Sequence, residues 1–139
     1  MSAFAPWLIL ASAAIIFLLG LVHLLYTFHG TKLHPRDDVL MARLKEISPI
    51  ITRETTMWRA WIGFNASHSY GAMLFGLIYG YLALVHNAFL FQSTFLLALG
   101  LLLLAGYVLL GKRYWFSVPF RGIALATVLY VVALFVRWA

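Results

Sequence analysis

Long apolar runs alternate with short polar connections along this chain, and the pattern predicts membrane-spanning helices. A helix needs about 20 consecutive apolar residues to cross the hydrocarbon core of a bilayer. Four runs meet that length, and we expect spans at about 7–28, 61–85, 88–110 and 118–136. Arg121 lies in the first turn of the last run, where its long side chain can reach the membrane surface. The expected fold class is therefore all-α: an integral membrane four-helix bundle that forms one domain over residues 1–139.

The connection between the first two predicted spans contains an amphipathic segment, PRDDVLMARLKEI. Pro35 stands at its start, two aspartates lie in its first turn, and Pro49 follows its end, all of which are helix boundary signals. We expect a short helix over about 36–47 that lies on the bilayer surface or on the bundle ends. A helix that docks a partner protein is the alternative. The apolar edge of this helix consists of Val39, Leu40, Leu44 and Ile47.

Composition supports the membrane assignment and excludes several classes of site. Hydrophobic residues make up 64% of the chain and charged residues 10%, whereas soluble domains are about a quarter charged. The chain has no cysteine, which excludes disulfides, thiolate metal sites and cysteine nucleophiles. The net charge of +6 does not indicate nucleic acid, because the charges lie between apolar runs, where they face anionic lipid headgroups.

The distribution of lysine and arginine predicts the orientation in the membrane. Arg137 alone falls on the side opposite to the other nine basic residues. The positive-inside rule therefore places the basic connections in the cytoplasm and both termini outside. The nine residues that flank these connections are Lys32, Arg36, Arg43, Lys45, Arg53, Arg59, Lys112, Arg113 and Arg121.

Polar residues within the predicted spans gather on one face of each helix. At 100° per residue, Asn65 and His68 share a stripe of the second span, and His23 lies on a matching stripe of the first. With a rise of ~1.5 Å per residue, both histidines lie within ~10 Å of the cytoplasmic ends of their spans. We expect a polar cavity on the cytoplasmic side of the bundle. Its candidate ligand-binding residues are His23, Tyr26, Trp61, Asn65, His68, Tyr107 and Thr127.

Several interpretations of this cluster remain open. As structural groups, Asn and His side chains join membrane helices by hydrogen bonds, typically for less than ~2 kcal/mol. As a binding site, the cluster would hold a lipid-like molecule oriented by Asn65 and Tyr26. As an enzyme, it would use His23 or His68 for proton transfer. Haem b ligation by His23 and His68 is a further alternative. A metal or ion path is disfavoured because no acidic residue lies within a predicted span.

The chain resembles a group of known proteins over nearly its whole length, and four segments carry this resemblance. They are LGLVHLLYTF, LHPRDDVLMARL, WRAWIGFNASHSYGAMLFGLIYGYLAL and KRYWFSVPFRGIALATVLY. In this combination the chain resembles a group of small, uncharacterised bacterial four-span membrane proteins. The resemblance implies only a recurring layout of His23, Asn65 and His68, and it implies no activity. We expect the protein in a bacterial cytoplasmic (inner) membrane.

Two classes of function follow from the sequence. In the first, the protein is a structural or accessory subunit that packs against a partner membrane protein or a second copy. Ala72, Gly76 and Gly80 recur every four residues, a spacing that allows close helix approach. In the second, the protein binds, or acts on, a lipid-like molecule.

Overall fold

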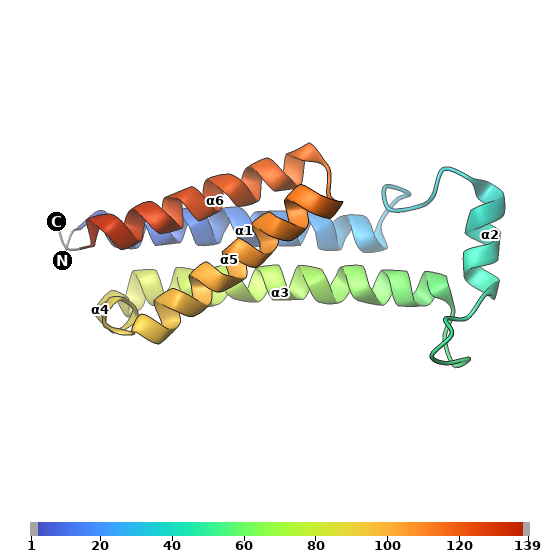
Figure 1. Ribbon diagram of the computed structural model, residues 1–139, viewed down its shortest axis with the longest axis horizontal. Coiled ribbons are helices and arrows are strands. Elements are labelled where there is room, and N and C mark those ends of the chain that lie inside the picture. The colour runs from blue at the N-terminus through green and yellow to red at the C-terminus, as the bar shows by residue number, and fades with distance from the viewer. Residues whose placement is uncertain (1–2, 138–139) are drawn as a thin grey trace. The chain divides into compact units, whose positions relative to one another are not determined.

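The computed structural model describes residues 3–137, and it is helical apart from short connections (Figure 1). No strand occurs in this described part of the chain. Four helices are long and apolar enough to cross a membrane, which confirms the expected all-α, four-span fold class. The helices are α1 Ala5–Phe28, α2 Asp38–Glu46, α3 Met57–Val85, α4 Asn87–Gln92, α5 Thr94–Tyr114 and α6 Ser117–Val136.

Contacts divide the chain into two units. Unit 1 consists of Met1–Leu19 and Ala72–Ala139, and unit 2 consists of Gly20–Gly71. The divisions fall within α1 and α3, so each of these helices contributes residues to both units.

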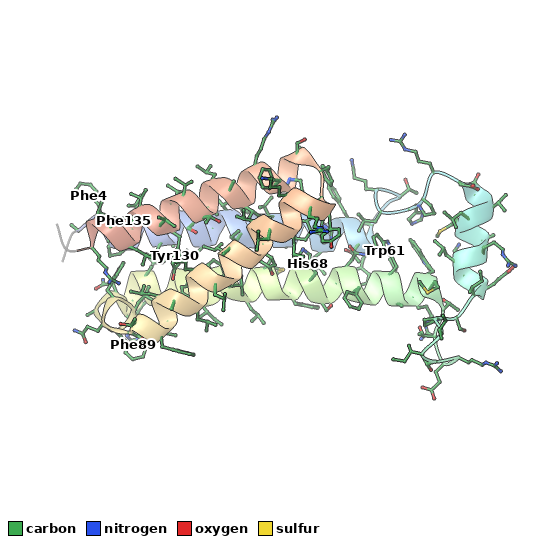
Figure 2. All side chains as sticks on the ribbon, in the orientation of Figure 1. Phe4, Trp61, His68, Phe89, Tyr130 and Phe135 are labelled. Carbon is green, nitrogen blue, oxygen red and sulfur yellow. The ribbon has the colours of Figure 1, made fainter. Side chains whose placement is uncertain are left out.

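Unit 1 is a four-helix bundle with an apolar core. Its buried side chains come from all four spanning helices and from α4. Helix α5 packs along α6, and Figure 2 shows Tyr130 of α6 pointing into the bundle. The core consists of Ala5, Ile9, Ala13, Ile16, Ala72, Phe75, Tyr79, Ala83, Leu90, Phe91, Leu97, Leu104, Ile123, Ala126, Tyr130 and Ala133.

Small residues bring α1 and α3 into direct backbone contact in unit 1. A Cβ atom on Gly76 would lie 2.5 Å from Cβ of Phe17 and 2.7 Å from the carbonyl oxygen of Ala13. A Cβ on Gly80 would meet the side chains of Leu10 and Ala13 at ordinary contact distance. The face with small residues every four positions is therefore used within this chain.

Two tyrosines fasten the first turn of α5 to α3 and α6. The Tyr79 hydroxyl donates to the carbonyl of Leu96 at 2.6 Å, and the Tyr130 hydroxyl donates to that of Leu97 at 3.1 Å. Their rings meet edge to face with centroids 5.9 Å apart. A buried tyrosine requires a partner for its hydroxyl, and the helix start provides one to each ring. Gly100 leaves room for them, since a Cβ there would collide with the Tyr130 hydroxyl.

The third apolar run is divided into two helices, which differs from the continuous span expected over 88–110. The break falls at Ser93, whose backbone is extended at φ −88° and ψ 96°. Its hydroxyl accepts a hydrogen bond from the Leu96 amide at 3.2 Å, so Ser93 is the N-cap of α5. The spanning helix therefore begins at Thr94 and continues to Tyr114.

Unit 2 contains the end of α1, the whole of α2 and the start of α3. The Asp37 carboxylate accepts from the amides of Val39 and Leu40 at 2.8 and 3.1 Å, so α2 begins at Asp38 rather than near 36. Figure 1 shows α2 running across the direction of the start of α3, and none of its residues is buried. Helix α3 begins at Met57 rather than near 61, and the Thr56 hydroxyl accepts from the Arg59 amide at 3.3 Å.

The outer surfaces of the spanning helices are apolar, as contact with lipid requires. Exposed leucines occur on each span. In unit 1, Phe4, Phe89 and Phe135 are exposed near one end of the bundle (Figure 2). The exposed leucines include Leu18, Leu74, Leu102 and Leu125.

Candidate functional site

Three polar side chains from α1 and α3 meet in unit 2. Nε2 of His23 lies 2.9 Å from Oδ1 of Asn65. The rings of His23 and His68 have centroids 5.4 Å apart, with planes at 87°. All three residues are half-buried. The structure thus brings together the residues at the centre of the expected cavity, and Figure 2 shows His68 and Trp61 along α3.

The hydrogen bonds of Asn65 determine which ring nitrogen of His23 carries hydrogen. Nδ2 of Asn65 donates to the carbonyl of Trp61 at 2.8 Å. A carbonyl oxygen only accepts, so the amide nitrogen must face Trp61, and the acceptor Oδ1 must face His23. Nε2 of His23 is therefore the donor, an assignment made from the hydrogen-bond network. In the neutral ring, Nδ1 then holds the lone pair and acts as an acceptor.

Hydroxyl groups beside the cluster are satisfied by their own helices. Thr27 donates to the carbonyl of His23 at 2.8 Å, and Ser69 donates to the carbonyl of Asn65 at 3.0 Å. Both hydroxyl residues are buried, and both bonds run to the residue four positions earlier, as is common for Ser and Thr in helices. These hydroxyls therefore do not compete for the imidazole and amide groups of the cluster.

Tyr26 and Trp61 lie on the side of the cluster nearest the connection to α2. The ammonium of Lys32 lies 5.0 Å from the ring centroid of Tyr26, within cation–π range. The indole Nε1 of Trp61 donates to the carbonyl of Leu33 at 3.2 Å. The two aromatic residues are 40% and 48% exposed, so they form a rim rather than a closed wall.

Two consecutive residues of the connection after α1 contact the start of α3. Leu33 accepts the bond from Trp61, and the ring of His34 meets that of Trp58 edge to face, with centroids 4.9 Å apart. Gly30 makes the preceding turn with a φ of +82°, a left-handed conformation that glycine adopts without strain. Sequence reasoning gave Trp58, Leu33 and Lys32 no role here.

Tyr107 and Thr127 belong to unit 1. The Thr127 hydroxyl donates to the carbonyl of Ile123 at 2.8 Å, within its own helix. The ring of Tyr107 lies 6.2 Å from that of Trp115, centroid to centroid. Neither residue shares a unit with the cluster of His23, so their part in the expected cavity stays a prediction.

Haem b ligation by His23 and His68 stays a prediction. Nε2 of His23 faces Oδ1 of Asn65, and the His23 and His68 rings stand edge to face. For metal ions, residues 3–137 contain no group of three or more His, Asp or Glu side chains with a suitable geometry.

The fold defines the class of this protein, a multi-pass all-α membrane protein with four spanning helices. No family model, no curated protein and no solved structure matches this chain. The resemblance to small bacterial four-span proteins therefore stays a prediction.

Proposed function

We propose that the protein binds a lipid-like molecule within the membrane, through His23, Asn65 and His68. The observation that carries this proposal is the 2.9 Å contact between His23 Nε2 and Asn65 Oδ1 with the His68 ring beside it. Ionisable side chains inside a span are costly, and they usually mark a functional site. The bond to Asn65 directs the acceptor nitrogen of neutral His23 away from the amide, where a ligand group can donate to it.

The chemistry around the cluster favours an uncharged polar headgroup on an apolar body. Helix α1 contains no charged residue, and in unit 2 the only charged residue of α3 is Arg59. At the imidazoles, these two helices therefore offer a charged headgroup no counter-charge apart from Arg59, and Lys32 lies outside them, against the Tyr26 ring at the rim. A hydroxyl group suits them better, since it can donate to Nδ1 of His23. The aromatic residues Tyr26, Trp61 and Phe64 are exposed and would contact the apolar body from the bilayer side.

A structural role is the second candidate, and Asn65 provides its support. Both halves of the Asn65 amide are used inside unit 2, one by Trp61 and one by His23. Such a bond joins two membrane helices without any ligand. The accessory-subunit version of this role is weaker, because Gly76 and Gly80 face α1 of the same chain instead of a partner.

The two candidates are separated by purification in native-lipid nanodiscs followed by quantitative mass spectrometry of bound molecules. For binding, we expect one molecule in fixed ratio to the wild-type protein, and its loss in His23→Ala and His68→Ala. Ser67→Ala is the matched control, because Ser67 is exposed on α3 and donates to its own helix at Phe64. If wild-type protein carries no such molecule and the histidine variants only lose thermal stability, the structural role is correct instead.

We also propose that the protein lies in a bacterial cytoplasmic membrane with its basic connections inside. The support is the predominance of lysine and arginine on the connections after α1 and α5. Because the chain has no cysteine, single cysteines report topology without a background. A cysteine at Asn87 should react with an impermeant reagent in intact cells, and cysteines at Asp38 and Tyr114 should not. The opposite pattern would reverse the orientation.

A further inference from the structure

The connection between α2 and α3 presents two isoleucines at the corner of a tight turn. The amide of Thr52 donates to the carbonyl of Pro49 at 3.3 Å, which places Ile50 and Ile51 at the two central positions of a β-turn. These positions favour Gly, Asn, Asp and Ser, which are small or bond to their own backbone. Here two β-branched apolar side chains occupy them, and their exposures are 108% and 91%.

The turn is the tip of a loop whose base is closed. The amide of Met57, the first residue of α3, donates to the carbonyl of Ile47 at 2.8 Å, directly after the end of α2. Near the tip, the Thr52 hydroxyl accepts from the Glu54 amide at 3.1 Å. Hydrogen bonds fix the backbone on either side of the two isoleucines, between Ile47 and Met57 and between Thr52 and Glu54. The exposed orientation of Ile50 and Ile51 is therefore part of an ordered turn.

The residues around the turn indicate which kind of surface contacts Ile50 and Ile51. Met57 follows Ile51 by six positions, so the tip lies within about 20 Å of the start of a spanning helix. Arg53 directly follows the turn, and Lys45 and Arg59 lie on the flanking helices. Apolar tips flanked by basic residues insert into membrane surfaces that contain anionic lipid.

Helix α2 also has exposed apolar side chains. Val39, Leu40 and Ile47 are exposed, and α2 buries no residue. The helix lies across the direction of the start of α3, as a helix in the membrane plane would (Figure 1). Ala42 lies on the opposite, polar side between Asp38 and Glu46, and it provides a reference position.

We propose that Ile50 and Ile51 insert into the headgroup region of an anionic lipid leaflet, together with the apolar edge of α2. The turn would then anchor the start of α3 at a fixed depth. This proposal is independent of a ligand at His23, since it concerns different residues and the bilayer itself.

The test uses single cysteines in this cysteine-free chain, reconstituted at one copy per nanodisc. Ile51→Cys and the control Ala42→Cys are labelled with an environment-sensitive fluorophore. In discs with one third phosphatidylglycerol, the label at 51 should emit at shorter wavelength and be quenched several-fold less by aqueous iodide than the label at 42. Equal quenching at the two positions would overturn the proposal.

Two further experiments test whether the lipid must be anionic, and whether lipid or a second chain covers Ile50 and Ile51. Arg53→Gln should reduce the protection at 51 in anionic discs towards that in phosphatidylcholine discs. If the labelled Ile51→Cys protein with Arg53 intact is protected equally in both lipids, the proposed preference for anionic lipid is wrong. The proposed insertion of the turn into lipid is then supported without that preference. If protection at 51 appears only in discs that hold two copies, a second chain covers the turn, and the lipid proposal is overturned.

Discussion

The two units of this protein are stabilised by different chemistry, although α1 and α3 contribute to both. In unit 1, every residue of the apolar core is packed between helices, and Gly76 brings two backbones into contact. In unit 2, α1 and α3 meet through polar and aromatic contacts, of His23 with Asn65 and of His23 with His68. Unit 1 should therefore respond mainly to changes of volume, and unit 2 to the loss of hydrogen-bonding groups.

The largest effect should come from Gly76→Ala in unit 1. The added methyl would lie 2.5 Å from Cβ of Phe17 and 2.7 Å from the carbonyl of Ala13, and neither atom can rotate away. The helices must separate, which we expect to lower the free energy of unfolding by about 3 kcal/mol. The measurement is reversible unfolding in mixed micelles.

Gly63→Ala is the matched control for this change, because Gly63 lies on the same helix in unit 2. No atom lies within 4 Å of a Cβ there, so alanine should leave stability unchanged or raise it by up to ~1 kcal/mol. Equal effects at the two glycines would show that α3 is packed similarly in both units, and the comparison would fail.

The second largest change in stability is expected at Gly100, which packs against the rings of Tyr79 and Tyr130. Gly100→Ala should destabilise the protein by about 2 kcal/mol, since its methyl would collide with the Tyr130 hydroxyl and lie 2.8 Å from the Tyr79 ring. Tyr130→Phe removes the colliding oxygen, at the cost of about 1 kcal/mol for the lost bond to Leu97. The double variant should therefore be more stable than the sum of the single effects predicts.

Gly106→Ala on the same helix serves as the control, because nothing lies within 4 Å of its Cβ position. Strict additivity of Gly100→Ala and Tyr130→Phe would contradict the described contact. Loss of stability in Gly106→Ala as large as in Gly100→Ala would indicate a general intolerance of α5 to alanine.

The number of spans was predictable because it depends only on the length and hydrophobicity of each run. The division at Ser93 was not predicted, although Gln92, Ser93 and Thr94 interrupt the apolar run with three polar residues. A single N-cap is a weak signal within such a run, and hydropathy averaged over a span hides it. The hydrogen bond from Ser93 to the Leu96 amide is visible only in the structure.

The candidate site was predictable to the level of helix faces. Helical periodicity placed His23 and Asn65 on the inward stripes of their spans, and the structure gives the 2.9 Å bond between them. Periodicity cannot supply contacts made by a loop, so the bond from Trp61 to Leu33 had no signal in the sequence. The pairing of Tyr79 with Tyr130 depends on two helices far apart in the chain and was equally hidden.

A smaller effect is expected for the bond between His23 and Asn65 in unit 2. Asn65→Ala should cost about 1–2 kcal/mol, because it leaves His23 Nε2 and the Trp61 carbonyl without the amide. A double-mutant cycle with His23→Ala should give a coupling energy of about 1 kcal/mol. Ser67→Ala in place of Asn65→Ala should give none. Zero coupling between His23 and Asn65 would mean that polar contacts do not hold unit 2 together.

The smallest effects come from two serines, one in each unit, whose side chains are both 0% exposed. Ser12 lies in the apolar core region of unit 1, and its Oγ has no hydrogen-bond partner among residues 3–137. Ser69 in unit 2 donates to the carbonyl of Asn65 at 3.0 Å. A buried hydroxyl without a partner carries an uncompensated desolvation cost, whereas a paired hydroxyl recovers it.

Ser12→Ala should therefore raise the free energy of unfolding by up to about 1 kcal/mol, and Ser69→Ala should lower it by about 0.5–1 kcal/mol. The two substitutions remove the same oxygen from equally buried positions, so opposite signs can arise only from the hydrogen bond. Thermal unfolding of both variants in the same detergent provides the measurement. If Ser12→Ala destabilises the protein as much as Ser69→Ala, unit 1 also relies on buried polar contacts, and the chemical difference between the units is smaller than their packing indicates.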